Sequence, residues 1–176
     1  MKQNFDALLK TVTDVTAGYS DRVSAGVAYV DLCEGQDLLY RMVRTAVIEK
    51  FPQEVRAYAQ ARLPFVAERL LALYLANDRS ASNMIAYNIA TQHIFPAELR
   101  ERAGLVTVED YVARGWQDHL LNLMDCDDFP AQARIRAGAL FIDSRVAAGE
   151  LGAVRIFADD LRIPCEIRAY AREQSL

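Results

Sequence analysis

The chain has 176 residues, of which 52% are hydrophobic and 25% are charged, a balance that is typical of a folded globular protein and excludes a disordered one. The formal net charge is −4, and no segment concentrates lysine and arginine as a duplex-binding surface would require. The three cysteines are too few and too widely spaced for a disulfide framework.

The N-terminal segment and the longest apolar stretch predict a chain that lies outside the membrane. Asp6 stands where the apolar core of a signal peptide would begin. The apolar stretch 64–76 contains Glu68 and Arg69 and is too short to span a bilayer. Together with the isolated cysteines, these features predict a soluble, reduced, cytoplasmic protein.

Hydrophobic residues recur at helical spacing along most of the chain, and few segments suit a strand. The pattern therefore predicts an all-α fold. We expect helices, in chain order, at residues 2–17, within 19–36 with a break at Gly35, and at 37–51, 52–62 and 65–75. The next expected helix ends at Ile94, and the remaining ones lie at 96–103, 107–124, 130–149, 150–158 and 164–176.

Two expected helix boundaries lie in the first half of the chain. Pro64 is expected to end one helix and begin another, because proline lacks the amide hydrogen and crowds the preceding turn. Residues 77–80 predict a turn, and Ser80 or Ser82 is expected to cap the helix that follows it.

A further boundary is expected in the second half. Gly104 is expected to stop a short helix, and Thr107 is expected to cap a longer one that runs to Met124. That longer helix would carry an apolar stripe at spacings of three and four residues. The stripe comprises Val108, Val112, Trp116, Leu120 and Leu123.

One ten-residue block, residues 95–104, recurs 34 residues later as residues 129–138 with seven identical positions. Looser copies begin at Phe51 and at Ile163. Self-similarity at a fixed period of this size is typical of stacked helical arrays. In all four copies an arginine follows the proline by four residues; these are Arg56, Arg100, Arg134 and Arg168.

The block has the residues of a helix start. Proline suits the first helical position, where the amide hydrogen has no partner within the helix. The acid or amide two residues later, as in Glu98 or Gln132, is expected to reach back to the amide that precedes the proline. Capping does not explain the arginine, so we expect each guanidinium to bind an acid or a carbonyl from the turn of the adjacent unit.

Residues 120–140 resemble the turn of HEAT-like repeats, in which a leucine-rich helix is followed by an acidic turn, a proline, an arginine and an alanine-rich helix. Residues 51–63 and 163–171 are similar to the second half of that pattern. The resemblance implies a short α-solenoid within a single all-α domain over residues 1–176, with N-terminal helices in 1–50 and helical repeats in 51–176. An irregular helical bundle is the alternative architecture.

No catalytic or cofactor motif stands out. His93 and His119 are not spaced as a metal-binding pair, and a general base formed by His119 beside Asp118 would lack an evident nucleophile. The sequence therefore predicts no cofactor and no metal.

The only tight group of carboxylates lies between two expected helices and comprises Asp125, Asp127 and Asp128. Three acids in one turn could hold a hard cation, but the group lacks the glycine and the distal glutamate of a calcium loop. An acidic entry to the helix that starts at Pro130 is the interpretation that we favour.

A stack of helix pairs offers an extended surface and seldom a deep reactive pocket. We therefore expect a non-enzymatic module that binds a partner protein, with Arg102, Trp116 and Arg136 as candidate contact residues. The alternatives are a small acidic inhibitor or immunity-type protein that neutralises a basic partner, a nucleic-acid-binding helical array, and an enzyme built around His119 and Asp118.

Overall fold

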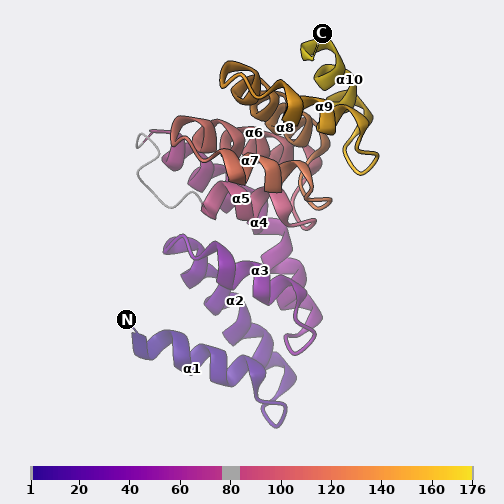
Figure 1. Cartoon of the computed structure of the whole chain (residues 1–176). Coiled ribbons are helices and arrows are strands. Elements are labelled where there is room, and N and C mark those ends of the chain that lie inside the picture. Colours follow the sequence, from indigo (N-terminus) through magenta and orange to yellow (C-terminus); the bar gives the residue numbers. More distant parts are fainter. Residues whose placement is uncertain (1, 77–83, 176) are drawn as a thin grey trace. The chain divides into compact units, whose positions relative to one another are not determined.

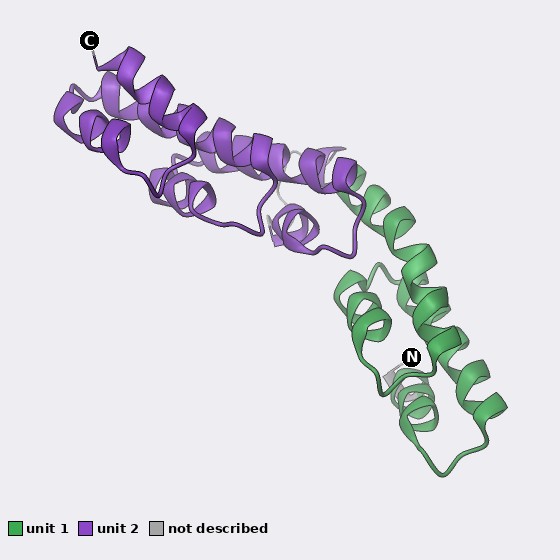
Figure 2. Ribbon diagram, turned by 90° about the vertical axis from the view of Figure 1, so that its right-hand side faces the viewer, with its two compact units in different colours: residues 1–73 green, residues 74–176 purple. Residues whose placement is uncertain are grey.

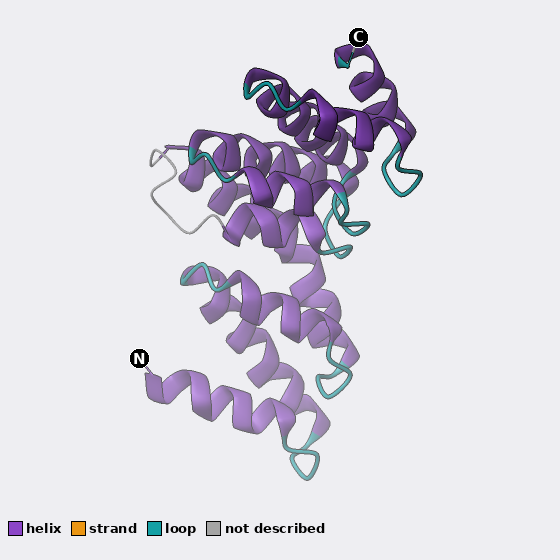
Figure 3. Cartoon of the chain, viewed as in Figure 1, coloured by secondary structure: helices purple, strands orange, loops and turns teal. Residues whose placement is uncertain are grey.

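The part of the chain that the structure describes, residues 2–76 and 84–175, folds into ten α-helices without a strand in a computed structural model (Figures 1 and 3). The all-α prediction is therefore confirmed. The helices are α1 (Lys2–Thr13), α2 (Tyr19–Gly35), α3 (Leu39–Val47), α4 (Gln53–Ala76), α5 (Met84–Thr91), α6 (Ala97–Ala113), α7 (Gln117–Met124), α8 (Ala131–Ala147), α9 (Leu151–Asp159) and α10 (Cys165–Gln174).

These helices pack as sequential pairs, in which a shorter first helix is followed by a longer second helix. α1 packs on α2, α5 on α6, α7 on α8, and α9 on α10. α3 is joined to α4 by the Gln60 side-chain amide, which donates to the Ala46 carbonyl oxygen at 3.2 Å. No helix among residues 2–76 and 84–175 is both long enough and apolar enough to cross a membrane.

The chain divides into two compact units, shown in different colours in Figure 2, and the boundary falls inside α4. Unit 1 covers residues 1–73 and unit 2 covers residues 74–176. Each unit has its own buried apolar side chains. Those of unit 1 include Val12, Val30, Met42, Val55 and Leu63, and those of unit 2 include Ile89, Leu120, Met124, Ile142 and Ile167.

Glycines let consecutive second helices approach closely. A Cβ atom placed on Gly104 of α6 would lie 2.8 Å from the Ala133 Cβ of α8, and one on Gly138 would lie 2.5 Å from the Ile167 Cδ1 of α10. In unit 1, a Cβ on Gly26 of α2 would collide with the Val55 side chain of α4. The helices could not pack this tightly if these positions carried a side chain.

The predicted helix break after Gly104 is wrong, since α6 continues to Ala113. Gly104 serves close packing, and the Thr107 hydroxyl donates to the Ala103 carbonyl inside the helix at 2.9 Å rather than capping a new one. Gly115, which follows the C-cap residue Arg114 and has a left-handed φ of 71°, terminates the helix instead. There the Trp116 amide donates to the Tyr111 carbonyl at 2.9 Å, as in a Schellman motif.

The predicted break at Pro64 is also wrong, because α4 runs through the proline from Gln53 to Ala76. Leu63, Val66 and Ala67 around it are fully buried, so tertiary packing outweighs the backbone hydrogen bond that proline removes. The predicted turn at 77–80 and the caps at Ser80 and Ser82 lie outside the described residues.

An arginine near the start of α2, α6 and α8 links each of these second helices to the first helix before it. The Nε atoms of Arg22, Arg100 and Arg134 donate to carbonyl oxygens ten residues earlier, at 2.9 to 3.1 Å, in the last turn of the preceding first helix. These carbonyls would otherwise lack a partner within the helix. The sequence pattern does not single out Arg22, which precedes the recurring block.

The same guanidinium groups extend to the next pair. Arg100 Nη2 donates to the Asp128 carbonyl at 2.7 Å, and Arg22 Nη2 donates to the Lys50 carbonyl at 3.2 Å. The expected contact with an adjacent turn is confirmed for Arg100. Within the described part of the chain, the buried Nε atoms of Arg56 and Arg168 have no hydrogen-bond partner.

The prolines of the block precede their helices by one residue. Pro96, Pro130 and Pro164 are N-cap residues, each with φ near −55° and an extended ψ, so the predicted first helical position is wrong by one. No capping side-chain bond accompanies these prolines. The Glu166 carboxylate instead accepts from its own backbone amide, which lowers its pKa.

Candidate functional site

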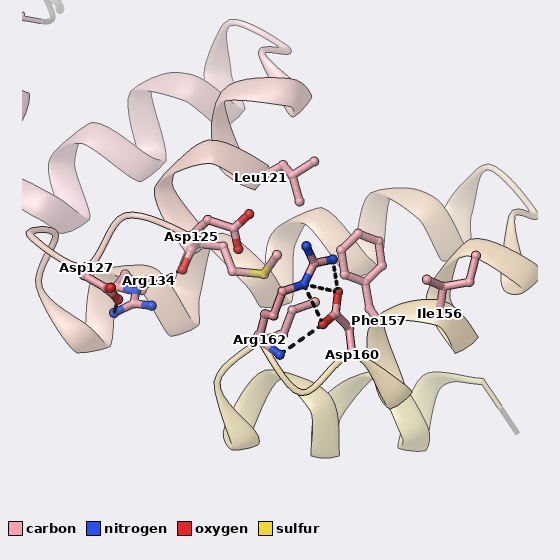
Figure 4. A pocket seen from close by; sticks show the side chains of 10 residues that line it. Leu121, Asp125, Asp127, Arg134, Ile156, Phe157, Asp160 and Arg162 are labelled. Atoms are coloured by element: carbon pink, nitrogen blue, oxygen red, sulfur yellow. Dashed lines mark hydrogen bonds and ion pairs between the residues drawn. The ribbon is translucent and has the colours of Figure 1, made fainter.

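A groove of about 530 Å³ lies in unit 2 between the first helices α7 and α9 (Figure 4). We call it the α7/α9 groove. Its walls come from the ends of both helices, the turns that follow them, and one side chain of α8. The lining residues are Leu121, Met124, Asp125, Asp127, Arg134, Ile156, Phe157, Asp160, Arg162 and Ile163.

The floor of the α7/α9 groove is continuous with the core of unit 2. Met124 and Ile163 belong to a buried apolar cluster, against which Leu121 and Phe157 pack while remaining partly exposed. Figure 4 shows Leu121 from α7 and Phe157 from α9 pointing toward the same space. Ile156, at the edge of the groove, is 69% exposed and is therefore accessible to a partner.

The turn after α9 contributes a charged pair to the groove. Arg162 donates from Nη2 to Asp160 Oδ2 at 2.6 Å and from Nε to Asp160 Oδ1 at 3.0 Å. The Arg162 backbone amide also donates to Asp160 Oδ1 at 3.0 Å. These bonds lower the pKa of the Asp160 carboxyl to about 2, and the bonds from the Arg162 guanidinium have the largest effect.

The second cation of the groove, Arg134, is also engaged. It donates from Nε to the Met124 carbonyl at 2.9 Å and forms an ion pair with Asp127 at 3.0 Å. The pKa of the Arg162 guanidinium is raised, mainly by Asp160. The exposed carboxylate of Asp125 lies close enough to make a smaller contribution in the same direction. The groove therefore combines an apolar floor with three carboxylates and two arginines that are already paired.

Unit 1 has a groove at the corresponding place, between its first helices α1 and α3, with a volume of about 380 Å³. Its charges are different. Arg41 and Arg44 face a single carboxylate, that of Asp6, and the guanidinium of Arg44 lies 5.9 Å from the centroid of the Tyr40 ring.

Trp116, a candidate from the sequence, is the N-cap residue of α7 and is 37% exposed. Its ring lies 5.0 Å from that of His119 and 5.6 Å from that of Tyr111, between centroids. The Arg114 guanidinium lies 5.2 Å from the Trp116 centroid and is anchored by an ion pair with the buried Asp110 at 2.8 Å. The result is an aromatic cluster at the turn between α6 and α7.

The two candidate arginines lie elsewhere in unit 2. Arg102 and Arg136 are exposed on the second helices α6 and α8. Arg136 lines a shallow depression between these helices, with Leu105 and Ile135 among its neighbours. The role of Arg102, Trp116 and Arg136 in partner binding stays a prediction.

Two carboxylates of the acidic turn after α7 have ion-pair partners. Asp127 pairs with Arg134, and Asp128 pairs with His93 Nε2 at 3.2 Å. Within residues 2–76 and 84–175, no three His, Cys, Asp or Glu side chains converge as metal ligands. His119, the candidate general base, has its ring against Tyr111 and Trp116.

The sequence alone does not reveal the α7/α9 groove, although it does single out two of the lining residues, Asp125 and Asp127, as members of an acidic group. Ile156 and Phe157 lie inside an expected helix, where the pattern gives them no special role. What distinguishes these two residues is that they are apolar and yet remain exposed or half-buried on a short helix. Exposure of this kind is visible only in the folded structure. Comparison with known proteins finds no matching family model, no matching curated protein and no matching solved structure.

Proposed function

We propose that the chain is a HEAT-like array of helix pairs that binds a partner protein through the first helices of unit 2. The recurring arginine and glycine contacts support the array, since Arg100 and Gly104 in α6 have counterparts in Arg134 and Gly138 of α8. Stacked helix pairs of this kind present extended surfaces for partners.

The observation that carries the proposal is the α7/α9 groove. It brings partly exposed apolar side chains, among them Leu121, Ile156 and Phe157, next to charged residues on one face. A bulky apolar anchor in a desolvated pocket, surrounded by polar contacts, is the usual source of affinity at protein interfaces. The groove is open and built from apolar packing and paired charges, which suits binding rather than acid–base chemistry.

Site-specific photo-crosslinking tests whether the α7/α9 groove contacts a partner protein, and it does not require the partner to be known in advance. A benzophenone amino acid would replace Ile156 in the groove, and a control would carry it at Ala169, an exposed position on the second helix α10. In extract from the source cell, we expect a discrete polypeptide adduct from position 156 that excess unlabelled protein abolishes. Adducts of equal yield from both positions, or from neither, would refute a binding face on the first helices.

A further inference from the structure

We infer that the α7/α9 groove binds a basic polypeptide segment that carries a bulky apolar side chain. This inference rests on the proposed function and specifies the chemistry of the partner. It joins two independent observations, the charge of the groove and the shape of its apolar part.

The net negative charge of the protein comes entirely from unit 2. Residues 74–176 contain 15 acidic and 11 basic residues, whereas residues 1–73 contain nine of each. The whole formal charge of −4 therefore belongs to the unit that holds the groove. A basic partner would be attracted to this unit over a range of about 10 Å at moderate salt.

Within the groove, three carboxylates outnumber two cations, and each cation is already paired with a carboxylate. The Arg134 side chain is only 18% exposed and is bound to Asp127 and to the Met124 carbonyl. The Arg162 side chain is 88% exposed, but its guanidinium is paired with Asp160 through Nη2 and Nε. Asp125 is exposed, and Asp127 keeps 94% of its side chain exposed despite its ion pair. Lysine or arginine of a bound segment would find these acceptors at the rim.

Two further carboxylates, those of Asp128 and Asp159, are exposed in or beside the same turns. Figure 3 shows the turns that follow α7 and α9 at one edge of unit 2. The acidic rim therefore extends past the groove, and a segment several residues long could engage it on both sides of a central anchor.

The apolar part of the groove determines that anchor. Leu121 and Phe157 leave part of their surface open above the buried floor, and Ile156 protrudes beside them. A leucine, methionine or phenylalanine side chain inserted there would remove apolar surface from water on both partners. A purely charged segment would leave this surface exposed.

The groove in unit 1 serves as an internal comparison. Arg41 and Arg44 give it a basic character, so it does not offer a basic segment the same complement. Tyr40 in that groove is 71% exposed, which matches the exposure of Ile156. A Tyr40→Ser variant is therefore a control for Ile156→Ser with a similar loss of exposed apolar surface.

The test uses three fluorescein-labelled peptides of about twelve residues and the full chain in fluorescence anisotropy. One peptide carries lysines on both sides of a Leu-Phe centre, the second replaces the lysines by glutamates, and the third replaces Leu-Phe by Ser-Ser. We expect binding of the first peptide only, with an affinity that falls at least about tenfold between about 50 and about 500 mM salt. Equal binding of the glutamate peptide or of the Ser-Ser peptide would overturn the inference.

The variants locate the interaction. Ile156→Ser and Asp125→Lys should each weaken binding of the first peptide at least about fivefold, while Tyr40→Ser and Glu173→Lys on α10 leave it unchanged. Because all four positions are exposed, each variant should retain the helical circular dichroism of the parent. An unchanged affinity in Ile156→Ser would overturn the assignment to this groove.

The two proposals fail separately. An adduct at position 156 from cell extract, with no binding of the lysine peptide, would refute the basic chemistry and leave the proposed function standing. Specific binding of the lysine peptide that survives Ile156→Ser, with no adduct at position 156, would refute both.

Discussion

Arg100 connects two helix pairs through one guanidinium group. Its Nε caps α5 through the Ala90 carbonyl, and its Nη2 reaches the Asp128 carbonyl in the turn after α7. Hydrogen bonds from charged groups contribute about 1.5–3 kcal/mol each when measured by deletion. At Arg100 and Arg134 the recurring arginine therefore has a structural role, which is independent of any partner.

We expect Arg100→Ala to lower the free energy of unfolding by about 2–3 kcal/mol, because it leaves two carbonyls without their donor. Arg155→Ala, which removes only a long exposed bond to the Ser175 carbonyl, should cost less than about 0.5 kcal/mol. Urea denaturation followed by circular dichroism measures both. Equal destabilisation by the two variants would contradict the capping role.

Cys33 provides a probe of native packing. It is fully buried in α2, and burial raises the pKa of its thiol to about 11. At a pH of about 8 the thiolate fraction is thus very small, and the sulfur is also inaccessible to reagents. Cys165, by contrast, is exposed at the start of α10.

Labelling with iodoacetamide at a pH of about 8 should modify Cys165 within minutes and leave Cys33 unmodified until denaturant is added. Peptide mass spectrometry of samples quenched over time identifies the modified residue. Reaction of Cys33 at the rate of Cys165 would show that α2 does not pack as described.

Asp160 should titrate at an unusually low pH. Its pKa is lowered from 3.8 to about 2 by Arg162, so the pair stabilises the folded chain above about pH 4, and this contribution is lost as the pH falls toward 2. In Arg162→Gln the carboxyl pKa should rise toward 3.8. The pKa of the Asp160 carboxyl is measured from its carboxyl carbon chemical shift by NMR between about pH 1.5 and about pH 6. An unchanged pKa in the variant would disprove the pairing.

At the scale of the helices, glycines have two distinct roles. Gly138 in α8 lies against Ile167 of α10 and allows close contact between these helices. Gly152 in α9 has open space around its Cα and serves no such contact. The same substitution should therefore have opposite effects at the two positions.

We expect Gly138→Ala to destabilise the protein by about 1–3 kcal/mol through overpacking against Ile167. Gly152→Ala should stabilise it by about 0.5–1 kcal/mol, because alanine loses less conformational entropy in a helix. Thermal melts of both variants measure these changes. Stabilisation by both would mean that α8 and α10 are not in close contact.

The sequence predicts the helices well and their boundaries less well. Local rules predict breaks at Pro64 and Gly104, but burial of Leu63 and Val66 around the proline, and the contact of Gly104 with Ala133, override those rules. The true end of α6 depends on the left-handed Gly115. Local propensity is a weak guide wherever tertiary packing selects the residue.

At the scale of the whole molecule, the 34-residue recurrence correctly indicates consecutive helix pairs, because the residues that join neighbouring pairs recur with them. The α7/α9 groove is not predictable in the same way. Leu121 and Ile156 are 35 positions apart and come together only when α7 and α9 lie side by side. A binding surface made from several pairs has no local sequence signature.

Methyl NMR of the chain labelled at isoleucine, leucine and methionine tests the proposed binding face most directly. On addition of the lysine peptide with the Leu-Phe centre, the methyl signals of Leu121, Met124 and Ile156 in the α7/α9 groove should shift. Those of Leu105 and Ile135, between the second helices α6 and α8, should not. Shifts at Leu105 and Ile135 without shifts in the groove would contradict a partner-binding face on the first helices.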